Sequence, residues 1–330
     1  MSCYHPVYAY KSKFVNPETG KAVIKFNLRP NQMDKFEPIA LPCGQCLGCR
    51  IEYSRQWANR LKLEREAHDA AWFCTFTYDD DHVPRSYYPD PETGEAIPSL
   101  TLCKRDFQLL MKRIRRRFPD DHIRFFACGE YGSQTFRPHY HAIIFGLHLD
   151  DLVPYKTVRE GGELYTYYNS PKLQSCWLDS DGKPIGFVVV GEVTWESCAY
   201  TARYVTKKLK GKEADFYEKH CISPEFSLMS RRPGIARDYY ESHPGIFDSD
   251  YINISTPKGG RKFRPPRYFE KLFEIEDPVR SKELKEIKKR LALDAQKSKL
   301  SKTSLELDEL LAVEEQNFTD KIKSLRRNLL

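Results

Sequence analysis

A chain of 330 residues has room for one large domain or two ordinary ones, and its 40% hydrophobic and 13% aromatic residues suffice for a folded core. No apolar run approaches the ~18 residues that would span a bilayer. The first ten residues lack the basic-then-apolar layout of a secretory signal. These features exclude a membrane-spanning protein and predict a soluble protein of the cytoplasm.

The net charge of +7 is unevenly distributed. Residues 104–117 hold seven Lys or Arg and a single acidic residue, Asp106. Local clustering of basic charge favours polyanionic partners, although a solvated helix face is the plain alternative. Arg113, Arg115 and Arg116 are therefore candidate DNA contacts.

Hydrophobic periodicity gives the order of the elements. A turn at 16–20 (NPETG) precedes a helix from 47 to 70, where apolar residues recur at helical spacing. The order then predicted is a strand at 72–78, a helix at 104–117, strands at 123–130 and 139–146, a long connection at 147–185, a strand at 186–193 and a helix at about 196–209. This β, α, β, β, β, α order predicts an α+β fold with a mainly antiparallel sheet flanked by helices.

The last fifty residues differ in character. Residues 281–330 are highly charged, nearly free of aromatic residues, and carry Leu284, Ile287 and Leu291 at helical intervals. We expect a helical tail that docks on the body or pairs with a partner, the alternative being a partly disordered tail.

Ten cysteines in a cytoplasmic chain argue against a disulfide framework. Six are scattered singly, and we expect them to be buried as small apolar residues; they are Cys74, Cys103, Cys128, Cys176, Cys198 and Cys221.

The other four cysteines can form a metal site. Cys43, Cys46 and Cys49 have the spacing of thiolates that hold one zinc ion, but a closed structural site needs four ligands. Cys3 is the natural fourth ligand and His5 its competitor. A structural Zn²⁺ would staple the N-terminus to the first helix; a reduced cluster without metal and an iron–sulfur centre are the alternatives.

His139 and His141 flank Tyr140 in a predicted strand. Residues two apart in a strand project to the same face, so both imidazoles share one face and Tyr140 enters the opposite layer. Two such imidazoles are half of a divalent metal site, although two surface histidines are the ordinary explanation of the spacing. Glu130 closes the preceding strand, and antiparallel pairing would bring its carboxylate beside the histidines. Such a ligand set leaves coordination positions open for substrate and suits Mn²⁺ at least as well as Mg²⁺.

Tyr200 and Tyr204 lie four residues apart, hence on one face of a helix, with Lys207 and Lys208 following. Packing of a helix against the sheet explains an isolated pair of this kind. The functional alternative is covalent catalysis, in which a tyrosine oxygen attacks a phosphodiester and conserves the bond energy for rejoining, while a nearby lysine assists at the phosphate or the leaving oxygen.

Together these segments resemble a known superfamily. The runs 73–78 (FCTFTY), 137–141 (RPHYH) and 200–208 (YTARYVTKK) resemble, in this order, the three motifs of the HUH endonucleases in their two-tyrosine replication-initiator branch. The runs 42–50 (PCGQCLGCR), 128–132 (CGEYG) and 229–235 (MSRRPGI) resemble more narrowly the replication initiators of gokushovirus-type microviruses. The resemblance covers roughly residues 1–245. One departure is Tyr140, where the superfamily prefers a plain hydrophobe.

The resemblance implies the roles of these residues. It implies an HUH-type sheet of ferredoxin- or RRM-like form, a metal held by His139, His141 and Glu130, and the nucleophiles Tyr200 and Tyr204. The implied organisation is a Cys-rich segment with the first helix at 1–70, an endonuclease core at 71–215, a basic DNA-contacting extension at 216–277 and a charged helical tail at 278–330.

The implied activity is nicking and rejoining of single-stranded or supercoiled phage origin DNA in rolling-circle replication, inside the bacterial host and with a host helicase and polymerase as partners. Further DNA contacts are expected from Arg203, Arg231 and Arg232, and basic and aromatic residues are interleaved at 251–268. A two-tyrosine transposase or mobilisation nickase is the alternative enzyme. A non-catalytic single-stranded DNA-binding protein is the alternative of another class.

Overall fold

The computed structural model describes residues 3–17, 22–160, 162–204, 208–209, 211–256 and 259–326. The chain forms two compact units. The larger comprises residues 54–272, and the smaller comprises residues 1–53 and 273–330.

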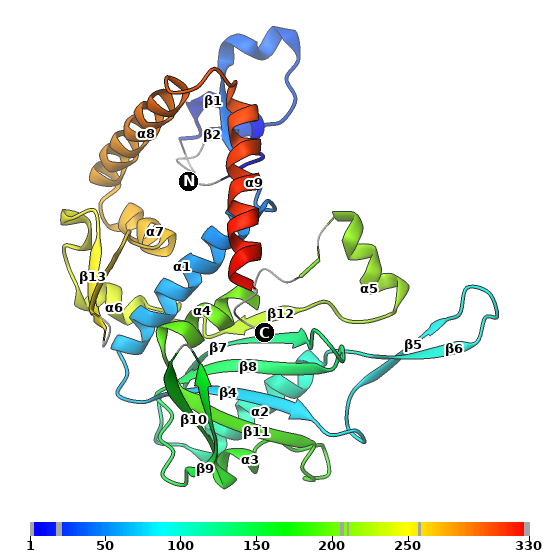
Figure 1. Ribbon diagram of the computed structural model, residues 1–330. Helices are drawn as coiled ribbons and strands as arrows, with labels where there is room; N and C mark the ends of the chain where they lie inside the picture. Colours follow the sequence, from blue (N-terminus) through cyan, green and yellow to red (C-terminus); the bar gives the residue numbers. More distant parts are fainter. Residues whose placement is uncertain are drawn as a thin grey trace. The chain divides into compact units, whose positions relative to one another are not determined.

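A seven-stranded sheet forms the centre of the larger unit (Figure 1). Its strand order is β12-β7-β8-β4-β11-β10-β9, and every neighbouring pair is antiparallel. The strands are β4 (Ala71–Tyr78), β7 (Arg124–Tyr131), β8 (Pro138–Phe145), β9 (Val153–Glu160), β10 (Glu163–Asn169), β11 (Gly186–Glu192) and β12 (Phe226–Met229). The expected α+β class with an antiparallel sheet is confirmed.

Helix α2 (Lys104–Arg117) covers one face of this sheet. Its apolar side, with Phe107 and Ile114 fully buried, packs on Phe76 of β4 and Tyr140 of β8. The short helix α3 (Pro171–Gln174) joins the same core through Leu173. Burial of each such side chain contributes about 1.5–3 kcal/mol, so this layer fixes α2 and with it the direction in which Tyr140 points.

The opposite face of β7 and β8 packs against α1 (Leu47–Glu66), α4 (Trp195–Tyr204) and α6 (Arg237–Ser242). Leu61 of α1, Ile143 of β8 and Ala202 of α4 belong to this second core. The remaining elements of the larger unit are β5 (Arg85–Pro89), β6 (Ala96–Leu100), α5 (Asp215–Lys219), β13 (Ile252–Thr256), β14 (Gly259–Phe263), the start of α7 (Arg267–Glu276) and 3-10 turns at Gly211–Ala214 and Ile246–Asp248.

The smaller unit contains a three-stranded sheet and two long helices. The sheet has the order β2-β1-β3, formed by β1 (Val7–Val15), β2 (Ala22–Lys25) and β3 (Phe36–Leu41), with a 3-10 turn at Pro30–Lys35. The charged C-terminal segment folds into α8 (Pro278–Leu300) and α9 (Leu307–Arg326), which confirms the helical tail. Within this unit α9 contacts the N-terminal segment: His5 lies 2.6 Å from Glu315, and Tyr8 donates to Asp308 at 3.3 Å.

Most of the elements expected from periodicity are present, and two expectations need correction. The connection at 147–185 is not structureless, because it contains the β9–β10 hairpin and α3. Its aromatic and β-branched residues around Gly-Gly carry a hairpin signal that the sequence reading passed over. Cys221 is exposed and Cys103 is half-buried, whereas the other four single cysteines are buried as expected. No helix among the described residues has the length and apolarity needed to cross a membrane.

Candidate metal centre and tyrosine helix

Antiparallel pairing of β7 with β8 builds the candidate metal centre. Glu130 stands directly opposite His139, and the two histidines project from β8 on the same face as the carboxylate. The loop between the strands is closed by hydrogen bonds between Gly132 and Arg137 at 3.0 Å and from Phe136 to Gly132. This loop fixes the register, and the register alone brings the three side chains together.

The ligand atoms of Glu130, His139 and His141 lie within 4.8 Å of one another. One oxygen of Glu130 is 2.8 Å from Nε2 of His139 and 3.1 Å from Nε2 of His141. The carboxylate is 2% exposed and His141 is 6% exposed, so the cluster is shielded from bulk water. A buried carboxylate in this position requires compensating positive charge.

The other ring nitrogens show what fits this cluster. Nδ1 of His139 lies 3.1 Å from the carbonyl oxygen of Arg137, which can only accept, so Nδ1 carries a proton. In neutral imidazole Nε2 then presents a lone pair to the carboxylate oxygen. Two lone pairs at this distance repel unless a proton or a cation lies between them. Nδ1 of His141 is held likewise by the hydroxyl of Thr75 at 3.0 Å. The donor set therefore fits a divalent cation bound through both Nε2 atoms and the carboxylate.

Tyr140 points away from this centre, as its strand position predicts. It is fully buried in the α2 layer, where its hydroxyl donates to the carbonyl of Cys103 at 2.8 Å and accepts from the backbone N–H of Cys103 at 3.1 Å. Burial raises the pKa of Tyr140, which keeps the phenol neutral. The bulky side chain thus anchors β8 to the N-terminus of α2 and does not disturb the histidines.

Helix α4 carries Tyr200 to the metal face of the sheet. The Tyr200 ring lies edge-on to His141, with centroids 5.3 Å apart, and edge-on to Phe73 at 6.1 Å. Phe73 in turn stacks on His141 at 5.5 Å. Tyr200 is 38% exposed, and the guanidinium of Arg203 lies 5.8 Å from its ring. An accessible phenol beside the imidazoles is a suitable arrangement for attack on a phosphate bound there.

Two further residues expected at this site lie outside what the structure describes. The backbone of Tyr204 completes α4, but its side chain is outside the described residues, and so is Lys207. Lys208 is described and exposed. The sequence reading also missed Thr75 as the partner of His141, although the alternation at 72–78 places it on the metal face.

The expected DNA-contacting arginines occupy two regions of the larger unit. Arg113, Arg115 and Arg116 belong to α2, on the sheet face opposite the metal centre. Arg113 donates to the carbonyls of Leu178 and Asp179 at 2.6 and 2.7 Å, which gives it a structural role.

Arg231 and Arg232 are exposed on the loop before α6. Arg124 anchors this loop by donating to the carbonyls of Pro233 and Gly234 at 3.1 and 3.0 Å. Arg60 adds a bond to the carbonyl of Ile235 at 2.8 Å. The exposed arginines are therefore presented from a fixed backbone.

Four cysteines gather in the smaller unit. The sulfur atoms of Cys3, Cys43, Cys46 and Cys49 lie within 4.8 Å of one another. Backbone N–H groups point at them, from Cys43 to the sulfur of Cys3 at 3.2 Å and from Cys46 to that of Cys43 at 3.2 Å. Burial opposes ionisation of Cys46, but N–H donors from Cys49 and Tyr4 lower its pKa to about 7. Cys3 is the fourth member of the cluster, whereas His5 is engaged with Glu315.

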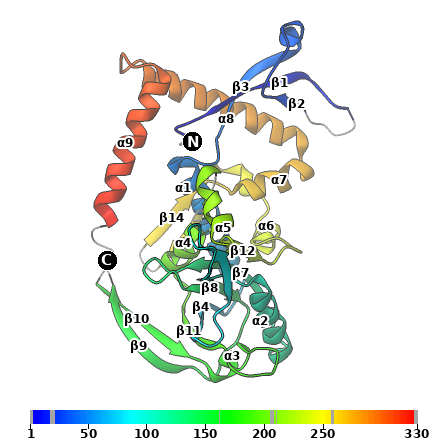
Figure 2. The ribbon, with the colours of Figure 1, turned by 90° about the vertical axis from the view of Figure 1, so that its right-hand side faces the viewer.

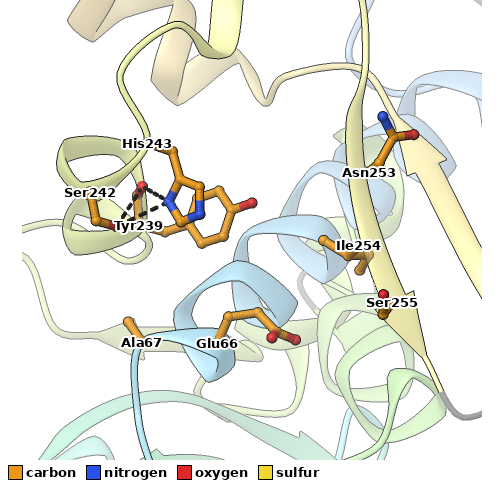
Figure 3. Close-up of a pocket in the computed structure, with 8 residues that line it drawn as sticks. All are labelled: Glu66, Ala67, Tyr239, Ser242, His243, Asn253, Ile254 and Ser255. Carbon is orange, nitrogen blue, oxygen red and sulfur yellow. Dashed lines mark hydrogen bonds between the residues drawn. The ribbon is translucent and has the colours of Figure 1, made fainter.

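A pocket of about 340 Å³ lies elsewhere in the larger unit, at the end of α1 and between α6 and β13 (Figure 3). Its polar lining is occupied by local contacts: the ring of His243 stacks on Tyr239 at 3.9 Å, and its Nδ1 lies 3.0 Å from the hydroxyl of Ser242. None of the metal-ligand candidates lines it. The lining residues are Glu66, Ala67, Tyr239, Ser242, His243, Asn253, Ile254 and Ser255.

Fold and site together define an α+β protein with a two-histidine, one-carboxylate centre beside a tyrosine-bearing helix. The family model for the replication-associated protein ORF2 matches residues 71–209. The chain is 32% identical over 282 residues to replication-associated protein ORF2 of Spiroplasma virus 4, which covers 84% of this chain and 81% of that protein. It therefore belongs to the family of phage replication-associated proteins.

Two further relatives agree. Replication-associated protein VP4 of Bdellovibrio phage phiMH2K is 28% identical over 314 residues, covering 88% of this chain and 86% of that protein. Replication-associated protein ORF4 of Chlamydia phage 1 is 30% identical over 255 residues, covering 73% and 55%. No solved structure matches significantly. The resemblance to replication proteins of small phages that the motifs indicated is confirmed.

Proposed function

We propose that this chain is a metal-dependent endonuclease and strand-joining enzyme that starts and ends rolling-circle replication of a small circular single-stranded phage genome. The observation that carries the proposal is the placement of Tyr200, whose ring lies 5.3 Å from that of His141 in a cluster suited to a divalent cation. Membership of a family of phage replication proteins supports a DNA substrate. The site of action would be the cytoplasm of the bacterial host, with a host helicase and polymerase completing the replication.

In the proposed reaction the phenolic oxygen of Tyr200 or Tyr204 forms a bond to the scissile phosphorus, and the bond from phosphorus to the 3′ oxygen breaks. The tyrosine proton ends on that 3′ oxygen, and the DNA 5′ end remains on the protein as a phosphotyrosine. Glu130, His139 and His141 would hold Mg²⁺ or Mn²⁺, whose charge polarises the phosphate when bound. Lys207 and Lys208 would assist at the phosphate or the leaving oxygen.

Strand joining is the reverse reaction. A free 3′ hydroxyl attacks the phosphotyrosine, the tyrosine leaves with the proton, and the DNA backbone is restored without an external energy source. A second tyrosine allows one end to be held while the other is cut after a full circle. This is the role proposed for the pair Tyr200 and Tyr204 on α4.

The sulfur cluster of the smaller unit would hold a structural zinc. Four thiol groups are the ligand set of closed zinc sites, and zinc–sulfur bonds of about 2.3 Å require sulfur atoms at about the spacing found here. Because Cys3 and Cys43 are forty positions apart in the chain, such a site would tie the N-terminus to the start of α1.

We retain the four-segment organisation as a proposal, with the endonuclease core at 71–215. The family match at 71–209 supports this core. Strand β12 comes from the following segment and pairs with β7, which is the strand that carries Glu130. The extension at 216–277 would therefore support the metal centre as well as contact DNA.

A covalent-adduct assay tests the proposed activity. The purified protein is incubated with Mn²⁺ and single-stranded oligonucleotides that tile the genome, and adducts are separated on a denaturing gel. We expect a protein–5′-DNA adduct at one origin sequence, reduced by Tyr200→Phe and abolished by Tyr200→Phe with Tyr204→Phe. Tyr251→Phe is the matched control, because Tyr251 is 39% exposed and has a Lys262 ammonium 5.2 Å from its ring. Absence of any adduct across the tiled set would refute the proposal.

A further inference from the structure

The metal face of the large sheet continues beyond the metal ligands. Side chains directly opposite each other in an antiparallel pair share a face. His141 and His139 on β8 are opposite Thr75 and Thr77 on β4, and Thr77 is opposite Phe187 on β11. Thr75 and Thr77 are half-buried and Phe187 is exposed, whereas their neighbours on the other face are buried. The metal ligands therefore belong to a face that is open over β4 and β11.

The β9–β10 hairpin extends this face to the edge of the sheet (Figure 2). Tyr168 pairs with Val190, and both pack in the core on the opposite side. Alternation along the strand then puts Tyr167 on the metal face, opposite Gly191. The Tyr167 ring lies across Gly191, where a Cβ would come within 3.3 Å of it. Lys156 is the partner of Tyr167 on β9.

A cation and three aromatic rings gather at this edge; we call Tyr155, Lys156, Tyr167 and Phe187 the hairpin strip. The rings of Tyr155 and Phe187 are 5.4 Å apart. The Lys156 ammonium lies 5.8 Å from the ring of Tyr155 and 5.5 Å from that of Tyr167. Tyr155 is 50% exposed and Phe187 is 41% exposed. Exposed aromatic rings beside a cation are a costly surface to leave in water unless a partner uses them.

The hairpin strip is continuous with the metal centre. Gly191, beneath the Tyr167 ring, pairs with Phe73 on β4, and Phe73 stacks on His141. Three strand spacings of about 4.8 Å separate β8 from β10, so the strip lies about 14 Å from the metal ligands. A chain molecule bound at the metal centre could follow this face outward to the hairpin.

We propose that the hairpin strip binds single-stranded DNA next to the segment held at the metal centre. Unpaired bases offer faces on which Tyr155, Tyr167 and Phe187 can stack, while Lys156 pairs with the phosphates. Duplex DNA hides its base faces, so the strip favours a single strand. This inference rests on the proposed function, because the metal centre supplies the point from which the strand extends.

Equilibrium binding tests the inference without any cleavage. Fluorescence anisotropy is measured with a labelled oligothymidylate in EDTA, so that binding is separated from catalysis. We expect Tyr155→Ala and Tyr167→Ala each to weaken binding by about fivefold or more, and Tyr167→Phe to bind as the wild type. Leu164→Ala is the matched control, because Leu164 is 63% exposed on the opposite face of the hairpin and should leave binding unchanged.

The charge has its own matched pair. Lys156→Ala should reduce the slope of log affinity against log salt by about 0.7, the value for one phosphate contact on a single strand. Arg159→Ala removes the same charge three residues along β9, on the opposite face, and should leave the slope unchanged.

Two results would overturn the inference alone: strip variants that bind the single strand as the wild type does, or equal losses in Leu164→Ala or Arg159→Ala. A strip that binds duplex DNA or RNA as tightly as the DNA single strand would also overturn it. Wild-type protein that binds no single-stranded DNA would instead remove the proposed function on which it rests. Thermal melting by circular dichroism identifies a variant that has failed to fold, and the paired Tyr167→Phe keeps the stacking argument testable.

Discussion

Thr75 and His141 face each other across β4 and β8, with the Thr75 hydroxyl 3.0 Å from Nδ1 of the imidazole. This contact leaves Nε2 of His141 directed at Glu130, 3.1 Å away. A partner on the far nitrogen of a ligating histidine fixes the orientation of the ring and raises its basicity. Thr75 is therefore a positioning residue for the metal centre.

Thr75→Val should weaken Mn²⁺ binding about 10- to 100-fold, because the isosteric change removes only the hydroxyl that holds His141. Calorimetric titration with Mn²⁺ measures this directly. Thr77→Val is the matched control, since its hydroxyl donates to the carbonyl of Phe187 at 3.1 Å and touches no histidine. Equal Mn²⁺ affinity of the Thr75 variant and the wild type would contradict the assignment.

His139→Ala should abolish adduct formation while single-stranded DNA binding in EDTA stays close to that of the wild type. The imidazole is proposed to act on the scissile phosphate, whereas affinity comes from basic and aromatic contacts elsewhere. His148→Ala is the control, because His148 is an exposed histidine held by Asp121 at 2.8 Å away from the metal ligands. Unchanged cleavage by the His139 variant would refute its role as a ligand.

Glu64→Gln should lower the free energy of unfolding by about 3–5 kcal/mol, because it leaves the Arg124 guanidinium without its buried partner. Glu64 is fully buried in α1 and also accepts from the backbone N–H of Ala236. Urea unfolding at pH 7 measures the loss. Glu66→Gln is the control two residues away, since it breaks only a surface pair with Lys62 and should change stability by less than about 1 kcal/mol.

The same carboxylate gives a pH dependence. Burial alone would raise the pKa of Glu64, but hydrogen bonds from His68, Arg124 and Ala236 lower it below the ordinary value. A lowered pKa stabilises the fold above the unfolded value of about 4.3, and this contribution is lost as the pH falls through the folded pKa. The stability difference between wild type and Glu64→Gln should therefore be largest at neutral pH and shrink in acid. A difference that grows below pH ~4 would contradict this sign.

Cys46→Ser should release zinc and lower the melting temperature, because three thiolates do not complete a closed site. Metal content by plasma mass spectrometry, with thermal melting before and after chelation, measures both effects. Cys221→Ser is the control, since Cys221 is an exposed cysteine outside the cluster. Equal zinc content in both variants, or no zinc in the wild type, would remove the structural zinc from the proposal.

The sequence by itself determined the parts of the site that depend on local geometry. Two-residue periodicity places His139 and His141 on one face, and a short hairpin loop sets Glu130 opposite His139, because register follows loop length between adjacent strands. The amphipathic pattern of 104–117 likewise predicts α2, and four-residue spacing puts Tyr200 and Tyr204 on one side of α4.

Only the tertiary structure decided which distant segments meet. The contact of Tyr200 with His141 depends on the order β8-β4-β11, which brings the strand before α4 to within two strands of the histidines. The choice of Cys3 over His5, the bonds that engage Arg113, and the extension of the metal face by the β9–β10 hairpin are also long-range. No periodicity encodes them, because they follow from the packing of whole layers against one another.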